Sequence, residues 1–213
     1  MLHLLDPLVI LALVLNFVAL GVSHIPAIIN AVAVQGMLLG IFPLFLGHEL
    51  TLRTLVLVVG TVVLKGFAIP RFLLHAMREA EIQREAKPMT GYVSSLLLGA
   101  FGTGLALVFS YTLPLAAQHR NLLLVPASLS TVWVGFLLLT TRRKAITQVL
   151  GYLVLENGIF LFGLLLLEAM PFLVEIGVLL DLFTAVFVMA IIIHQISREF
   201  SSLSTEYLSE LKE

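Results

Sequence analysis

The sequence predicts an all-α polytopic membrane protein with about seven transmembrane helices. Of its 213 residues, 60% are hydrophobic and only 12% are charged, whereas a soluble domain carries roughly 25% charged residues. Successive apolar runs of about 20 residues have the length that a helix needs to cross a hydrocarbon core about 30 Å thick. Backbone exposed to lipid must satisfy its own hydrogen bonds, so these runs are expected to be helices.

The predicted spans follow the apolar runs. They cover roughly residues 3 to 22, 25 to 46, 50 to 70, 91 to 113, 121 to 140, 148 to 167 and 172 to 195. The amino terminus lacks the basic residues of a signal peptide, so the first span is expected to be retained. Between the third and fourth spans, Pro70 and Pro88 bracket a predicted amphipathic surface helix.

This pattern divides the chain into three regions. Residues 1–118 are predicted to form a four-helix membrane region with an inner surface helix at about 71–87. Residues 119–196 are predicted to form a three-helix membrane region, and residues 197–213 a cytoplasmic tail. The tail is either a short amphipathic helix that docks on a partner or a solvated end.

Lysine and arginine in short loops set the orientation of a membrane protein. In the predicted topology one side carries Arg71, Arg78, Arg84, Lys87, Arg142, Arg143, Lys144, Arg198 and Lys212. The other side carries Arg53 and Arg120. We therefore expect the amino terminus outside and the carboxyl terminus inside.

Two carboxylates are predicted near the centre of the membrane. Glu156 and Asp181 lie in the sixth and seventh spans, about 12 Å and about 14 Å from the nearest boundary at 1.5 Å per residue. Intramembrane acids are costly and are functional candidates by default. Because the two helices run antiparallel, the acids can meet directly or through water. They either hold and release protons or, as protonated acids, lock two helices together by a hydrogen bond.

The neighbours of these acids favour an interior position. Tyr152 lies one turn before Glu156 and could hydrogen-bond it, and Asn157 follows the acid directly. Thr184 lies three residues after Asp181. Glycines that permit close helix approach are Gly151, Gly158 and Gly163.

Two other charged residues lie nearer the predicted boundaries. Glu175, close to the outer boundary, marks either a helix end or a proton exit. Lys65 lies about one turn from the inner end of the third span; it either snorkels to the boundary, the interpretation we favour, or takes part in a proton path. The chain has no cysteine, and no two histidines have the spacing of metal ligands on a helix. Any redox centre is therefore expected on a partner.

Signatures of enzymes are missing from the sequence. It has no phosphate-binding glycine loop, no HExxH and no G-x-S-x-G motif. It also has no run of basic residues interleaved with aromatic ones that would indicate nucleic-acid binding. We expect no catalysis by this chain on its own.

Two segments together carry a family resemblance. They are "LGYLVLENGIFLFGLLLLEAMPFLVEIGVLLDLFTAVFVMAIIIHQI", residues 150–196, and "LKGFAIPRFLLHAMREAEIQREAKP", residues 64–88. They resemble the hydrogenase-4 component E family, membrane subunits of group 4 nickel–iron hydrogenase and formate hydrogenlyase-like complexes related to respiratory complex I. The resemblance implies a nickel–iron centre and iron–sulfur clusters on partner subunits, antiporter-like sister subunits in the membrane, and a bacterial or archaeal cytoplasmic membrane.

The same resemblance implies roles for the acids. The last three spans are similar to the three-helix K subunit of complex I and to the C subunit of multisubunit sodium/proton antiporters. The K subunit carries a glutamate in its second helix and another in its third, and Glu156 and Asp181 would fill comparable positions. Glu156 lies about one helical turn from the position of the K-subunit glutamate. The acid in the third of these helices is an aspartate, where the K subunit has a glutamate.

Three functions fit these observations. The leading hypothesis is a proton-path and assembly subunit of a membrane-bound hydrogenase complex. A subunit of a multisubunit cation/proton antiporter would use the same acids without a redox arm. A purely structural scaffold would use them only to lock helices.

Overall fold

The computed structural model describes residues 5–45, 52–79, 88–113 and 123–164. The predicted seventh span and the tail lie outside these ranges, as do Asp181, Glu175 and Thr184.

Every regular element in the described ranges is helical. In chain order the elements are α1 (Leu5–Gly21), α2 (Ile25–Ile41), the 3-10 turn η2 (Phe42–Leu44), α3 (Leu52–Val63), the π-helical turn η3 (Leu64–Ala68), α4 (Ile69–Glu79), α5 (Tyr92–Thr112), α6 (Leu124–Thr141) and α7 (Ala145–Leu164). The all-helical prediction is confirmed for this part of the chain.

Five of the described helical segments are long and apolar enough to cross a membrane. They are Ile25–Leu44, Val58–Arg78, Tyr92–Thr112, Leu124–Thr141 and Ala145–Leu164, and the apolar helix Asp6–Gly21 is shorter. Apart from the third, the first six predicted spans agree with observed helices to within a few residues at each end. The count of seven and the sidedness of the chain stay predictions.

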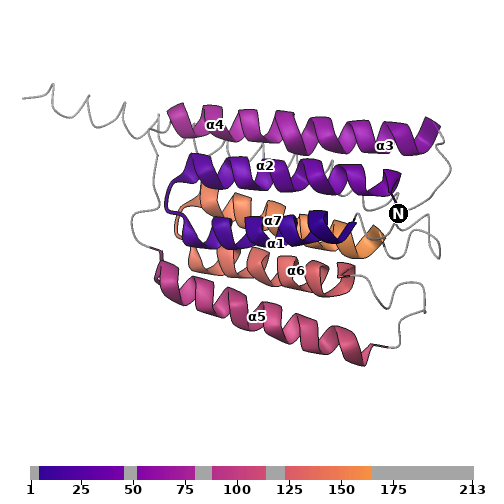
Figure 1. Ribbon diagram of the computed structural model, residues 1–213. Coiled ribbons are helices and arrows are strands. Elements are labelled where there is room, and N and C mark those ends of the chain that lie inside the picture. Colours follow the sequence, from indigo (N-terminus) through magenta and orange to yellow (C-terminus); the bar gives the residue numbers. More distant parts are fainter. Residues whose placement is uncertain (1–4, 46–51, 80–87, 114–122, 165–213) are drawn as a thin grey trace, which may run out of the picture.

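The sequence predicts that the third span ends at about Pro70, and this prediction is wrong. The helix continues from α3 through η3 into α4, and Figure 1 shows the three as one unbroken rod. Proline inside a regular α-helix clashes with the carbonyl four residues earlier. Here the turn just before Pro70 is π-helical, and the Ile69 N–H bonds the carbonyl of Leu64, five residues back. This wider turn accommodates the proline without breaking the helix.

The residues of the predicted surface helix that are described, 71–79, are therefore an extension of the third helix. Leu73, Ala76 and Met77 of this extension are buried in the bundle, while Arg71 and Arg78 are exposed. Its amphipathic character is confirmed, and the break that would separate it from the span is absent.

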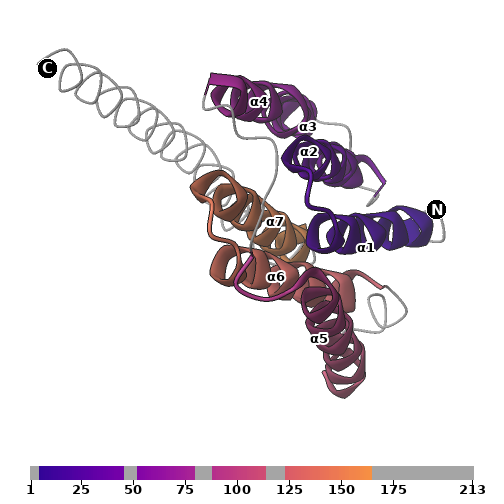
Figure 2. The same ribbon diagram turned by 90° about the vertical axis from the view of Figure 1, so that its left-hand side faces the viewer.

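The helices form a bundle with a central group and two peripheral elements. Helices α1, α2, α6 and α7 lie in the middle, the α3–α4 rod packs on α2 at one side, and α5 packs on α6 and α1 at the other (Figures 1 and 2). The peripheral segments are only 28% and 22% buried, against 56% to 67% for the spans of α2, α6 and α7.

Basic residues gather at one end of the bundle, called here the basic end. The α4 helix, with Arg71 and Arg78, runs to the end where residues 142–144, Arg-Arg-Lys, connect α6 to α7 (Figure 1). The α1–α2 connection lies at the same end. Arg53, at the start of α3, lies at the opposite end.

Glycines bring α6 and α7 into backbone contact. A methyl group added at Gly151 would lie 2.6 Å from the backbone nitrogen of Leu139, and one at Gly158 would lie 2.6 Å from that of Val132. The prediction that these glycines permit close approach is confirmed. Gly163 differs, because a methyl group there meets nothing within 4 Å among the described residues.

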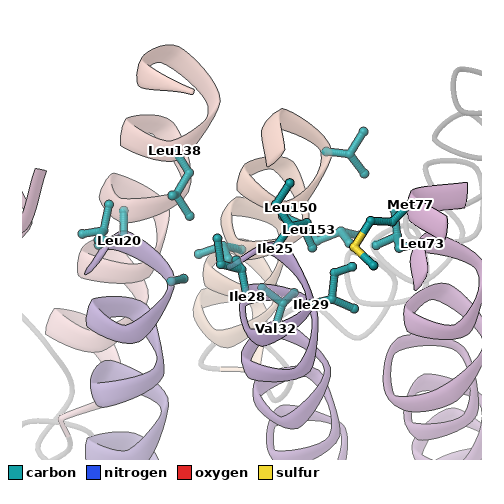
Figure 3. Close-up of a cluster of buried hydrophobic side chains, with 14 of the residues drawn as sticks. Leu20, Ile25, Ile28, Ile29, Val32, Leu73, Met77, Leu138, Leu150 and Leu153 are labelled. Carbon is teal, nitrogen blue, oxygen red and sulfur yellow. The ribbon is translucent and has the colours of Figure 1, made fainter. Parts of the chain in front are cut away.

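Two apolar clusters fill the two halves of the bundle. The basic-end cluster, part of which is shown in Figure 3, contains Leu20, Ile25, Ile28, Ile29, Val32, Leu73, Met77, Leu138, Leu150 and Leu153 among others. The opposite-end cluster contains Val9, Leu39, Phe42, Leu124, Ala127, Leu161 and Leu164. The two leave a layer between them near the middle of the helices.

The glycine contacts make a testable prediction about stability. Gly158→Ala places a methyl group against the backbone of α6, so it should destabilise the protein by about 1–3 kcal/mol. Gly163→Ala, on the same helix, should be neutral or stabilise by up to about 1 kcal/mol because alanine is the better helix former. Thermal unfolding in mild detergent, followed by the fluorescence of Trp133, the one tryptophan of the chain, measures both. Equal melting temperatures for the two variants would contradict the packing argument.

Candidate functional site

A buried ion pair occupies the layer between the two apolar clusters. Lys65 Nζ lies 3.1 Å from Glu156 Oε1, and each side chain is only 8% exposed. The ammonium also lies 5.3 Å from the centroid of the Phe160 ring, within the range of a cation–π interaction. The interpretation that Lys65 snorkels to the boundary is therefore wrong: its side chain points into the bundle.

Local backbone features allow Lys65 to reach α7. The residue lies in the π turn η3, and such turns occur frequently at functional sites. A methyl group on Gly36 of α2 would lie 2.8 Å from Lys65 Cβ, so glycine is needed for the lysine stem to pass α2. In the same way Gly66 leaves room for the side chain of Met37. The two glycines bring the π turn and α2 close together.

A chain of side-chain hydrogen bonds extends the pair across the bundle. Lys65 Nζ donates to Asn157 Oδ1 at 3.3 Å. Asn157 Nδ2 donates to Gln35 Oε1 at 3.2 Å, and Gln35 Nε2 donates to Asn16 Oδ1 at 2.8 Å. Three buried amides, one each from α7, α2 and α1, are thus connected to the ion pair.

The chain continues to α6 and ends on the backbone. Asn16 Nδ2 donates to Thr131 Oγ1 at 2.8 Å, and Thr131 Oγ1 donates to the carbonyl of Ala127 at 2.7 Å. Gln35 Nε2 makes a second bond, to the carbonyl of Ala12 at 3.1 Å. We call the residues Lys65, Glu156, Asn157, Gln35, Asn16 and Thr131 the polar layer.

A small cavity touches the polar layer on the side of the basic end. It has a volume of about 10 Å³ and is lined by Ile29, Val32, Ala33, Lys65, Ile69, Pro70, Leu73, Leu150, Leu153 and Asn157. This is about the smallest space that holds one water molecule, which needs at least two polar partners. Lys65 and Asn157 can supply them.

Arg142 is a second buried cation, away from the polar layer. It is 1% exposed, its Nη2 donates to the carbonyl of Leu20 at 2.6 Å, and its guanidinium lies 4.9 Å from the Tyr92 ring centroid. A cation near the last carbonyls of a helix is favourable. Arg142 therefore ties the ends of α1 and α6 to the start of α5 at the basic end.

The structure unites three of the residues singled out from the sequence, Lys65, Glu156 and Asn157. Tyr152 is half-buried one turn before Glu156 on α7. Whether Asp181 approaches Glu156 stays a prediction. Within the described ranges, no three histidine, aspartate or glutamate side chains are grouped so that they could hold a metal ion.

Sequence reasoning missed three members of the layer, Asn16, Gln35 and Thr131. The two amides each stand in the middle of an apolar run, which is a visible signal. It is a weak one, because Asn30 stands in the same run as Gln35 and is exposed. Thr131 carries no signal of its own, since threonine is common in helices that cross membranes and bonds its own helix backbone.

Two relatives match most of the chain. Uncharacterized protein Rv0085 of Mycobacterium tuberculosis is 34% identical over 192 residues, which are 88% of this chain and 86% of that protein. Hydrogenase-4 component E of Escherichia coli K12 is 31% identical over 150 residues, 70% of this chain and 68% of that protein. The chain belongs to the hydrogenase-4 component E family. With its apolar helices, this member of the family is an integral protein of a bacterial membrane.

No family model matches the chain, and no solved structure matches it. The resemblance of the last three spans of this family member to the complex I K subunit therefore stays a prediction.

Replacing the lysine of the ion pair by an apolar side chain should be strongly destabilising. Lys65→Met leaves the Glu156 carboxylate buried without its ammonium, and breaking a buried pair in this way costs about 3–5 kcal/mol. The double variant Lys65→Met, Glu156→Met should recover most of this loss, because two apolar side chains replace two charges.

Thermal unfolding of the purified chain compares these variants with Arg143→Met, an exposed position that should change stability by no more than about 0.5 kcal/mol. A double variant that is less stable than Lys65→Met would argue against the pair.

Proposed function

We propose that the chain is a non-catalytic membrane subunit of a membrane-bound nickel–iron hydrogenase complex related to complex I. In this proposal it lies in a bacterial or archaeal cytoplasmic membrane with its amino terminus outside. It contributes to a proton path and to the assembly of the membrane arm. The nickel–iron centre and iron–sulfur clusters belong to partner subunits, and antiporter-like subunits cover part of its apolar surface.

The family supports the complex, and the ion pair supports the proton path. Hydrogenase-4 component E is by its name one component of a hydrogenase. The Lys65–Glu156 pair lies in the middle of the bundle, where an ionisable group is costly and marks an ion or proton pathway by default. This pair is the observation that carries the proposal.

Proton transfer at the pair is simple chemistry. Glu156 accepts a proton on a carboxylate oxygen, becomes a neutral carboxylic acid, and later releases the proton to the next group. Asp181, predicted at a similar depth in the seventh span, is the candidate for that group, and Glu175 is a candidate exit. Lys65 supplies the positive charge that holds Glu156 as a carboxylate between transfers.

Protons need a way into the polar layer. The two apolar clusters separate the layer from both ends of the described bundle. The cavity beside Lys65 and Asn157 extends the layer toward the basic end, so one water there would shorten the distance to that surface. The remaining steps need movement of an apolar cluster or entry through the side of the bundle.

Coupling to redox chemistry requires two states with different proton affinity. A ligand or a charge shifts an equilibrium only by its differential interaction with the two states. In this proposal, electron transfer in the peripheral arm changes the field or the geometry at the Lys65–Glu156 pair, so that Glu156 binds its proton in one state and releases it in the other.

A scaffold role is the second candidate, and one observation favours it. The amides of the polar layer join α1, α2, α6 and α7 through hydrogen bonds, and a fully paired buried network makes a core rigid. In that case the ion pair only fixes the helices, and its ionisation has no part in transport.

Purification of the intact complex tests the assignment. A tag on the carboxyl-terminal tail and a mild detergent should retrieve the chain together with subunits that contain nickel and iron–sulfur clusters. Mass spectrometry of the co-purified chains and a metal assay give the answer. A chain that purifies alone and without metal would contradict the hydrogenase assignment, and sodium-dependent transport by a metal-free assembly would favour the antiporter.

Glu156→Gln tests the proton path against the scaffold. The amide keeps the shape of the side chain and an acceptor for Lys65 but cannot carry a proton, so proton translocation should fall by about tenfold or more while assembly and hydrogen production persist. Asp181→Asn should act in the same way. Asp6→Asn, at the first turn of α1, is the matched control. Full translocation in Glu156→Gln would leave the scaffold as the better account.

Translocation is measured as acidification of vesicles that contain the purified complex, with hydrogen production in the same sample as the reference.

A further inference from the structure

We infer that Asn157, Gln35, Asn16 and Thr131 form an oriented relay of hydrogen bonds that keeps Lys65 positively charged whether or not Glu156 is ionised, so that Glu156 is the member of the pair that carries the proton. This inference deepens the proposed proton path and rests on it for its functional meaning. The four relay residues are positioning residues, since they act through Lys65.

The direction of the relay is set at its far end, by the backbone of α6. The hydroxyl proton of Thr131 is donated to the carbonyl of Ala127. The Thr131 oxygen is then left to accept, so Asn16 must present its NH₂ group to it, at 2.8 Å. The carbonyl oxygen of Asn16 is thereby turned toward Gln35.

Gln35 is held in one orientation from two sides. Its NH₂ group donates both to Asn16 Oδ1 and to the carbonyl of Ala12. A flipped amide would place its oxygen against two acceptors, so this orientation is fixed. Gln35 Oε1 consequently faces Asn157 and accepts from Asn157 Nδ2.

The relay ends with an oxygen aimed at the ammonium. With its NH₂ group donating to Gln35, Asn157 presents Oδ1 to Lys65 Nζ at 3.3 Å. Every amide dipole along the relay therefore has its negative end toward Lys65. Aligned hydrogen bonds polarise one another and strengthen the last one in the series, and the face of the Phe160 ring adds a further interaction that only a cation gains.

The relay matters most when Glu156 takes up a proton. The acid then loses its charge, and the Coulomb attraction within the pair disappears. The relay and the aromatic ring remain, and both favour the ammonium over the neutral amine. Lys65 thus stays a fixed cation while the proton is bound and released at the Glu156 carboxylate.

The charge of Lys65 can be measured directly. The chain contains only Lys65, Lys87, Lys144 and Lys212, so ¹⁵N labelling of lysine side chains gives few signals in solid-state NMR of the full-length chain in lipid vesicles. Lys65→Met identifies the Lys65 signal by its loss. In Glu156→Gln, which mimics the protonated acid, Lys65 should still give the ammonium signal.

Breaking the relay should convert part of the Lys65 ammonium into the neutral amine. In the double variant Glu156→Gln, Gln35→Leu, Asn157 loses the acceptor that turns its Oδ1 toward Lys65. The hydrogen bond to the ammonium is then no longer held in place, so the ratio of amine to ammonium at Lys65 should rise by about tenfold. Glu156→Gln, Gln148→Leu is the matched control, because Gln148 bonds the carbonyl of Arg142 outside the layer. Thr131→Val in the Glu156→Gln background is a milder cut, with Thr141→Val on the same helix as its control.

An amine signal for Lys65 in Glu156→Gln alone would overturn the inference, as would an unchanged ammonium signal in both relay variants. The measurement needs no partner subunits. A chain that purifies without a hydrogenase but keeps Lys65 charged in Glu156→Gln would refute the proposed function and leave the relay standing. A chain that purifies with a hydrogenase but gives an amine signal for Lys65 in Glu156→Gln would refute the relay alone.

Discussion

The Lys65–Glu156 ion pair is the constraint on which the middle of this bundle depends. Two charges removed from water regain their desolvation cost only when the geometry is good and further hydrogen bonds satisfy the remaining donors and acceptors. Lys65 has a second acceptor in Asn157 and an aromatic face in Phe160. The buried amides of α1 and α2 meet the same requirement, because the side-chain amide of Asn157 must itself be hydrogen-bonded.

Several local irregularities are explained by this requirement. A regular helix up to Pro70 would carry a steric conflict, and the π turn that relieves it contains Lys65. Gly36 lets the lysine stem pass against α2. Gly151 and Gly158 bring α6 against α7, so that Thr131 and Glu156 belong to one compact layer. The positions that lack side chains are therefore as important to the site as those that carry charge.

The sequence was sufficient for the helices and for Glu156, but not for the site. Apolar runs give the spans because lipid imposes their length, and an acid in such a run stands out. The partner of Glu156 could not be deduced, because a lysine about one turn from a boundary can snorkel outward as easily as point inward. The deciding features, a π turn and the passage at Gly36, arise from packing between helices. The amides were ambiguous for the same reason: Gln35 is buried and Asn30, five residues earlier on α2, is exposed.

The charge balance of the polar layer gives a reason for a second acid. With Glu156 ionised, the pair is neutral, and the apolar clusters on either side can enclose it. Once Glu156 binds a proton, the layer holds one positive charge that aligned amides lower in energy but cannot cancel. A carboxylate at the same depth would cancel it, and Asp181 is predicted to lie there. The positive charge at Lys65 would then be shared between two acids, so proton binding at one acid is coupled to the charge of the other. A proton path between the sixth and seventh spans requires this coupling.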